Sequence, residues 1–120
     1  MINISGEWKY SEEFDNGKDI GIVSITQNGE ELIGEMRYTE YFLDHKPLEL
    51  LQTVRGRIVG NKINLKGQLI SFINMESCEY YLDEFDGVYT SEGKIVGSTM
   101  DQNNVCGVFV LERVVSNEKE

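Results

Sequence analysis

The sequence predicts an eight-stranded antiparallel up-and-down β-barrel, a single all-β domain over residues 1–120, and three observations indicate it. The first is a five-residue unit, apolar-x-Gly-x-apolar, which recurs along the chain and puts apolar side chains and glycine on one face of a strand. The second is the series of Asn-Gly and Gly-Asn pairs between these units, which favour tight hairpin turns because both residues tolerate positive φ. The third is the composition, in which 12 glycines, one proline and six tyrosines favour strands over long helices.

The first three strands are expected at residues 5–14, 20–27 and 30 to 38 or slightly beyond. Asn16-Gly17 and Asn28-Gly29 separate them, and two-residue turns at both pairs bring apolar faces together. This agreement between turn chemistry and apolar pattern favours a meander. The expected facing residues are Trp8 with Ile25, Tyr10 with Val23, Ile25 with Leu32, and Val23 with Gly34.

Residues 39–51 are expected to form the one long loop, an apolar flap over one end of the barrel. This segment contains the only proline and the only histidine of the chain, and it is too apolar to be a freely solvated loop. We interpret His45 as a solvated loop residue, because nothing nearby in the sequence supplies a nucleophile and an orienting group.

The clearest hairpin is predicted at residues 54–69, where two copies of the glycine unit flank Gly60-Asn61. A two-residue turn there puts apolar residues and glycine, up to Leu69, on one face, and basic and amide residues such as Arg55 and Arg57 on the other. The expected partners are Val59 with Lys62, Ile58 with Ile63, Gly56 with Leu65 and Val54 with Gly67.

The last strands follow a less regular turn at residues 70–77 and are expected at residues 78–89, from about 95, and at 105–114. A three-residue loop at residues 91–93 aligns Tyr89 with Ile95 and Gly87 with Gly97. Eight strands joined in order can close on themselves and leave no unpaired edge. Residues 116–120 are expected to form a short disordered tail.

Charge and cysteine usage exclude several classes of protein. The 21 acidic and 11 basic residues leave a formal net charge of −10, which disfavours binding to nucleic acid or to an anionic membrane surface. The chain shows no export signal and no apolar run of membrane-spanning length, so we expect a cytoplasmic protein. Cys78 and Cys106 lie far apart and are interpreted as buried free thiols.

No segment carries a metal, nucleotide or catalytic motif. Residues 15–19 alternate oxygen-bearing side chains, but the glycine and glutamate that a calcium loop requires are missing. Asp83 and Glu84 point to opposite faces of a strand and cannot act as a catalytic pair there. We therefore expect no metal, no cofactor and no enzymatic activity.

Two short motifs carry a family resemblance that spans nearly the whole chain. Gly6-Glu7-Trp8 at the start of the first strand, with Leu111-Glu112-Arg113 in the last, resembles the signature of the calycins, the superfamily of lipocalins, fatty-acid-binding proteins and avidins. The resemblance implies the barrel, with Trp8 closing one end and Arg113 packing across it. Members of this superfamily commonly bind a ligand inside the barrel. The resemblance implies ligand binding here only as a tendency of the family.

The interior and the outer surface each supply candidate functional residues. Inward glycines leave room for a small apolar or amphipathic molecule, which we expect to contact Tyr38, Asp83, Tyr89 and Thr99. On the outside of the last two strands, Val96, Cys106, Val108 and Val110 form an apolar patch, the candidate interface of a homodimer or of a partner protein.

Two functions remain open at this point. The first is a non-enzymatic lipocalin-like carrier or sensor of a small molecule. The alternative is an acidic protein-interaction module, such as an inhibitor or toxin-immunity protein, whose charge of −10 meets a basic partner protein. A barrel filled by its own side chains favours the second function, and an open interior favours the first.

Overall fold

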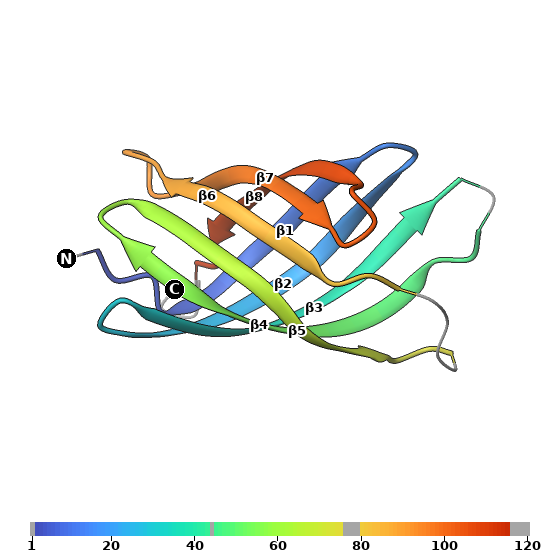
Figure 1. The fold of residues 1–120 in the computed structure, drawn as a ribbon, viewed down its shortest axis with the longest axis horizontal. Coiled ribbons are helices and arrows are strands. Elements are labelled where there is room, and N and C mark those ends of the chain that lie inside the picture. Colours follow the sequence, from blue (N-terminus) through green and yellow to red (C-terminus); the bar gives the residue numbers. More distant parts are fainter. Residues whose placement is uncertain (1, 44, 76–79, 116–120) are drawn as a thin grey trace.

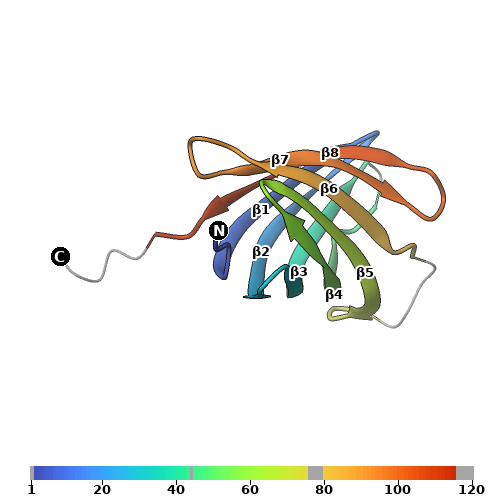
Figure 2. The ribbon, with the colours of Figure 1, turned by 60° about the vertical axis from the view of Figure 1, so that its left-hand side comes forward.

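A computed structural model describes residues 2–43, 45–75 and 80–115 and confirms the predicted closed, antiparallel, up-and-down barrel (Figure 1). Each strand pairs with its sequence neighbour, and β1 pairs with β8 to close the wall. The chain leaves β8 beside the start of β1, where Trp8 is paired with Arg113 (Figure 2). The strands are β1 (Gly6–Phe14), β2 (Gly17–Asn28), β3 (Glu31–Phe42), β4 (Leu48–Val59), β5 (Lys62–Phe72), β6 (Asp83–Tyr89), β7 (Ile95–Asp101) and β8 (Cys106–Arg113).

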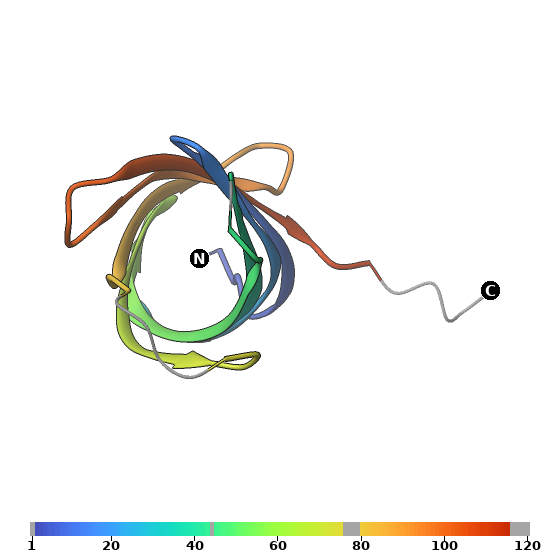
Figure 3. The ribbon, with the colours of Figure 1, turned by 90° about the vertical axis from the view of Figure 1, so that its right-hand side faces the viewer.

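The core lies inside this ring because alternate residues of each strand point inward. Figure 3 looks along the barrel and shows the segment before β1 lying within the outline of the wall. Ile4 in that segment is fully buried, and Ile2 packs against the core. Large side chains from every strand fill much of the interior, among them Trp8, Tyr10, Met36, Phe85 and Phe109.

The hairpin registers predicted for the second half of the chain are confirmed. Gly56 pairs with Leu65, Ile58 with Ile63 and Tyr89 with Ile95. Gly56 allows the close approach of β4 and β5, since a Cβ atom there would lie 1.7 Å from the carbonyl oxygen of Asn64.

In each of the first two hairpins the turn lies one position away from its predicted place, so every cross-strand partner differs from the prediction by two positions. Phe14 pairs with Gly17, so the turn consists of Asp15 and Asn16, and Asn16 supplies the positive φ of 68°. Gly17 is instead part of the strand, where a Cβ atom would lie 2.7 Å from the Phe14 ring. The second turn likewise moves to positions 29 and 30. Each shift keeps the same face inward, and the resulting partners are Tyr10 with Gly21, Trp8 with Val23, Ile25 with Gly34, and Val23 with Met36.

The predicted flap over residues 39–51 is wrong, because most of this segment belongs to strands β3 and β4. Thr39 pairs with Glu49 and Glu40 with Leu48, which leaves only residues 43–47 between the strands. Glu40 of β3 and Leu50 of β4 both face inward and are buried. Because Glu40 is polar, it interrupts the apolar alternation that would have identified this part of β3 as a strand.

Two predictions for the middle of the chain also need correction. A β-bulge pairs Val54 with Gly67 but Thr53 with Leu69, so Gln68 is the extra residue. The bulge reverses the alternation, and Leu69, predicted to face inward, is 64% exposed while Ile70 packs against the core. Strand β6 begins at Asp83 rather than residue 78, and residues 76–79, like the predicted tail at 116–120, lie outside the described residues.

Candidate functional site

The two ends of the barrel differ, and the end at the start of β1 is closed. Trp8 is fully buried there, and its Nε1–H donates a hydrogen bond to the carbonyl oxygen of Ile4 (3.0 Å). The Arg113 guanidinium lies 4.3 Å from the centre of the Trp8 ring and donates to the carbonyl oxygen of Ser5 (2.8 Å). Gly6 has a φ of +131°, and a Cβ atom there would lie 2.9 Å from Arg113 Nη1. The contact between Trp8 and Arg113 that the family resemblance implied is therefore present.

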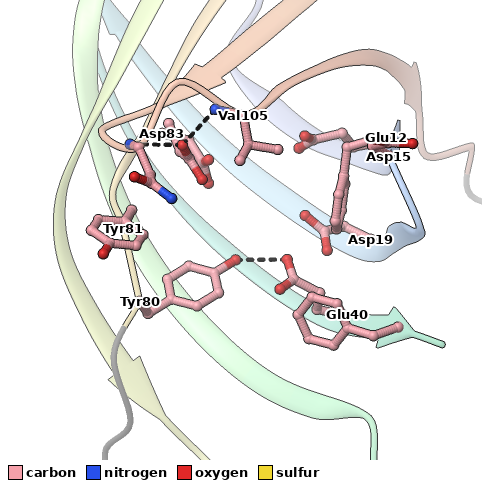
Figure 4. Close-up of a pocket in the computed structure, with 12 residues that line it drawn as sticks. Glu12, Asp15, Asp19, Glu40, Tyr80, Tyr81, Asp83 and Val105 are labelled. Atoms are coloured by element: carbon pink, nitrogen blue, oxygen red, sulfur yellow. Dashed lines mark hydrogen bonds between the residues drawn. The ribbon is translucent and has the colours of Figure 1, made fainter. Parts of the chain in front are cut away.

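The opposite end contains a cavity of about 280 Å³. This volume is slightly below the range of roughly 300–1,000 Å³ that is usual for sites of drug-sized ligands. Figure 4 shows Glu12, Asp19 and Glu40 along one side, facing Tyr80 and Asp83. None of the lining residues in the described part of the chain is basic, and they are Glu12, Phe14, Asp15, Asp19, Glu40, Phe42, Tyr80, Tyr81, Asp83, Asp101, Asn103 and Val105.

Three of the carboxyl groups form a row across neighbouring strands. Glu12 of β1 pairs directly with Asp19 of β2, and Asp19 pairs directly with Glu40 of β3. All three residues are buried, with exposed fractions of 5%, 2% and 5%. Like charges at directly opposed positions of a sheet destabilise it, and burial makes the repulsion stronger. We call Glu12, Asp19 and Glu40 the carboxyl row.

Hydroxyl groups stabilise the outer members of the carboxyl row better than the middle one. The Thr99 hydroxyl donates to Glu12 Oε2 (2.8 Å), the Tyr10 hydroxyl donates to Glu12 Oε1, and the Tyr80 hydroxyl donates to Glu40 Oε1 (2.8 Å). Asp19 Oδ2 lies 3.2 Å from the same Tyr10 hydroxyl, whose single proton is engaged with Glu12. Asp19 Oδ1 is buried and accepts no hydrogen bond from the described residues.

A second polar group joins the cavity wall to the interior. The fully buried Gln52 of β4 donates from Nε2 to Asp83 Oδ2 (3.1 Å) and to the Tyr38 hydroxyl (3.0 Å). Its Oε1 accepts the backbone N–H of Asp83 (3.2 Å). Gly67 makes room for this amide, because a Cβ atom there would lie 2.0 Å from Gln52 Oε1. The Tyr38 and Tyr80 hydroxyls lie 3.0 Å apart and connect this group to the carboxyl row.

Burial shifts the protonation of these acids. It is the main cause that raises the pKa of Asp19 from 3.8 to about 11, and the neighbouring Glu40 carboxyl adds to the shift. A protonated Asp19 can donate a hydrogen bond to Glu40. In this form Asp19 carries no charge and needs no further hydrogen-bond donor. Burial raises the pKa of Glu12, against the hydrogen bonds from Tyr10 and Thr99. Burial also raises the pKa of Asp83 to about 7, although the Gln52 hydrogen bond opposes it.

The structure brings together three of the four predicted ligand-contacting residues. Asp83 lines the cavity, Thr99 binds Glu12, and Tyr38 contacts both Gln52 and Tyr80. Tyr89 lies at the other end of β6, where its backbone N–H donates to Asn61 beside the β4–β5 turn. It is therefore not part of this cavity.

The sequence interpretation missed the carboxyl row and Gln52. A signal for the row was available, since Glu12 shares strand parity with Trp8 and Tyr10, and Asp19 shares it with Val23. Extending the inward alternation to the ends of the strands would have placed these acids inside.

The predicted apolar patch does lie on the outer surface. Val96 pairs with Val110 across β7 and β8, Val96 and Val108 are 37% and 60% exposed, and Val110 is half-buried. Cys106 is free, as expected, but it is exposed rather than buried because it begins β8 on the outward parity. Cys78 lies outside the described residues. The homodimer predicted from this patch stays a prediction.

Neither a metal site nor a membrane-spanning helix is present in the described part of the chain. Among residues 2–43, 45–75 and 80–115, no three His, Cys, Asp or Glu side chains are grouped so that they could hold a metal ion. Over the same ranges, the structure contains no helix with the length and apolarity needed to cross a membrane.

Comparison with known proteins finds likeness in structure alone. No family model and no curated protein matches the sequence. The fold is similar to a redesigned β-barrel, mFAP1, bound to DFHBI, with a TM-score of 0.67, 10% identity, and coverage of 91% of this chain and 94% of that one. It is also similar to the redesigned barrel b11L5F_LGL (TM-score 0.65, 11% identity, 92% and 91% coverage) and to a de novo designed fluorescence-activating β-barrel (TM-score 0.56, 12% identity, 95% and 100% coverage). At these identities the likeness shows the fold.

Proposed function

We propose that the protein is a non-enzymatic, lipocalin-like barrel that binds a small amphipathic molecule in the cavity at its open end. The observation that carries the proposal is the cavity of about 280 Å³, into which buried polar groups converge from strands distant in the sequence. Phe14, Phe42 and Tyr80 supply apolar wall, and Glu12, Asp19 and Asp83 supply polar groups. Mostly apolar walls with a few placed polar groups are typical of small-molecule sites.

The structural neighbours support this proposal through their shared fold. The solved structures named mFAP1 and mFAP0 are barrels of this fold with DFHBI bound, which shows that such a barrel can hold a small molecule. In the present chain the closed end is filled by Trp8 and the segment before it, so the open end is the place for a ligand.

The test is thermal unfolding with three probes that share a six-carbon chain and differ in charge, n-hexylammonium, 1-hexanol and hexanoate. A ligand that binds only the folded protein raises the unfolding temperature. We expect at least one probe to do so, and we expect Val105→Trp, which fills the cavity from its wall, to abolish the rise. Ile33→Trp is the matched control, because Ile33 is 52% exposed on β3 and lines no part of this cavity. An unchanged unfolding temperature with all three probes, or a rise that survives in Val105→Trp, contradicts the proposal.

The alternative is an acidic interaction module, and one observation favours it. Asp15, which is exposed, and Asp101 both line the cavity, so a lysine or arginine of a basic partner protein could approach these carboxylates from outside. This function predicts tight binding of a basic protein with a strong salt dependence and no stabilisation by any of the three probes.

A further inference from the structure

The carboxyl row has no basic side chain beside it in the described part of the chain. Glu12, Asp19 and Glu40 are direct neighbours across β1, β2 and β3, and all are buried at one side of the cavity. No described lysine, arginine or histidine lines the cavity, and the ion pairs of Arg57 with Glu30 and Lys94 with Glu112 lie on the exposed surface. Buried carboxylates normally have a cation beside them or stay protonated.

An unsatisfied acceptor marks where a cation would enter. Asp19 is only 2% exposed, it lines the cavity, and its Oδ1 accepts no hydrogen bond from the described residues. Without a ligand, the partner that remains is a proton shared with Glu40. An ammonium group offers three N–H donors, which could reach several carboxyl oxygens of the row at once.

The remaining wall suits the rest of such a molecule. Phe14, Phe42 and Tyr80 line the same cavity and present aromatic surface to an alkyl chain. Aromatic faces also attract a cation directly. The described residues contain no group of ligands arranged for a metal ion, which favours an organic cation over an inorganic one.

We propose that the ligand is an organic cation, a protonated amine or amidine on a short apolar chain, and that its charged group binds the carboxyl row and displaces the proton that Asp19 holds in the absence of ligand. This inference rests on the proposed function. The balance is simple: the ligand enters as R–NH₃⁺, the O–H bond of Asp19 breaks, and one proton passes to the buffer. No covalent bond forms between ligand and protein.

The surroundings of Asp19 support the displacement of a proton. Burial and the neighbouring carboxyl raise its pKa, so it is protonated at neutral pH when no cation is bound. A cation beside the carboxyl reverses this effect, since an opposite charge within about 4–6 Å favours the ionised form. The titratable groups that face Asp19 are Tyr10 and Glu12 from β1, Tyr38 and Glu40 from β3, Tyr80 from the segment before β6, and Asp83 from β6.

The experiment is isothermal titration calorimetry of the intact chain at pH 7 with n-hexylammonium, 1-hexanol and hexanoate, in phosphate and in MOPS, two buffers that differ in ionisation enthalpy and contain no primary ammonium group. We expect hexylammonium to bind about tenfold or more tightly than hexanol, because charge-assisted hydrogen bonds add that much affinity, and we expect hexanoate to bind most weakly. The apparent enthalpy should differ between the two buffers by the ionisation enthalpy of about one proton released. Asp19→Asn should remove the buffer dependence and weaken hexylammonium binding, whereas Asp86→Asn, on the outer face of β6, should change neither.

The outcomes distinguish a failure of this inference alone from a failure of the proposed function. If hexanol or hexanoate bound as tightly as hexylammonium or more tightly, and Val105→Trp abolished that binding, the inference of a cationic ligand would be refuted. The proposal of a small-molecule site would stand. Tight hexylammonium binding with the same enthalpy in both buffers would overturn the displaced proton. Failure of all three probes to bind the folded protein would overturn both proposals.

Discussion

Replacing Asp19 by asparagine is expected to stabilise the protein at neutral pH and to have little effect near pH 4. Asp19 is buried, and burial followed by the Glu40 carboxyl raises its pKa from 3.8 to about 11. The folded protein therefore holds a proton at pH 7 that the unfolded chain has released. The stabilising contribution of such a group is complete below pH 3.8 and is lost as the pH rises toward 11. Asparagine has the same shape and an oxygen acceptor but does not titrate.

The size of this stabilisation is set by how far the pH lies above the pKa of Asp19 in the unfolded chain. Each pH unit above 3.8 favours the ionised, unfolded form of Asp19 by about 1.4 kcal/mol as long as the folded form stays protonated. Asp19→Asn should therefore raise the free energy of unfolding by up to about 4 kcal/mol at pH 7, by less than about 2 kcal/mol at pH 5, and by almost nothing at pH 4. These are upper values, because water that reaches the carboxyl in the cavity lowers them.

Urea unfolding, followed by the fluorescence of the single tryptophan, measures this difference. Trp8 is fully buried at the far end of the barrel, so it reports global unfolding without contact with the substituted residue. Glu35→Gln, exposed on β3, removes the same charge outside the barrel and should give a difference within about 0.5 kcal/mol at both pH values. Destabilisation by Asp19→Asn at pH 7, or an equal effect at pH 7 and pH 4, would refute the reasoning.

Three further substitutions test the packing that positions the cavity, each by urea unfolding. Arg113→Ala removes the stacking on the indole and two hydrogen bonds to backbone carbonyls, and should lower the free energy of unfolding by about 1–3 kcal/mol. Arg113→Lys keeps the charge and should lower it by less than Arg113→Ala does. Gly56→Ala places a Cβ atom 1.7 Å from the carbonyl oxygen of Asn64 and should cost about 3 kcal/mol or more, so a neutral result would show that β4 and β5 are farther apart. Thr99→Val removes the hydroxyl donor to buried Glu12 and should cost about 1–3 kcal/mol, and most of that cost should disappear at a pH low enough to protonate the carboxyl.

The barrel could be predicted from the sequence because the turn residues and the alternation of inward apolar residues agreed along most of the chain. The prediction failed where a polar residue occupied an inward position. Glu40 interrupts the apolar pattern of β3, and this led to the false flap, although the residue is buried and paired in the sheet. The bulge at Gln68 could not be seen either, because a period-2 pattern gives no sign of the residue at which it reverses.

The candidate site was harder to predict because it depends on register. The inward positions of Asp83 and Thr99 were predicted from strand parity alone, but Glu12, Asp19 and Glu40 become neighbours only when two hairpin registers are both correct. The first hairpin turns at Asp15 and Asn16 rather than at the Asn-Gly pair. The predicted register would have separated the carboxyl groups from their true partners.

The most direct test of the central claim, that the open end binds a small molecule, is a backbone ¹H–¹⁵N NMR titration with whichever six-carbon probe binds most tightly. We predict that the largest shift changes occur around Glu12, Asp19 and Glu40, at one end of the barrel, while the Trp8 indole resonance stays in place. Largest changes on the outer surface around Val96 and Val108, or at the Trp8 end, would contradict the claim.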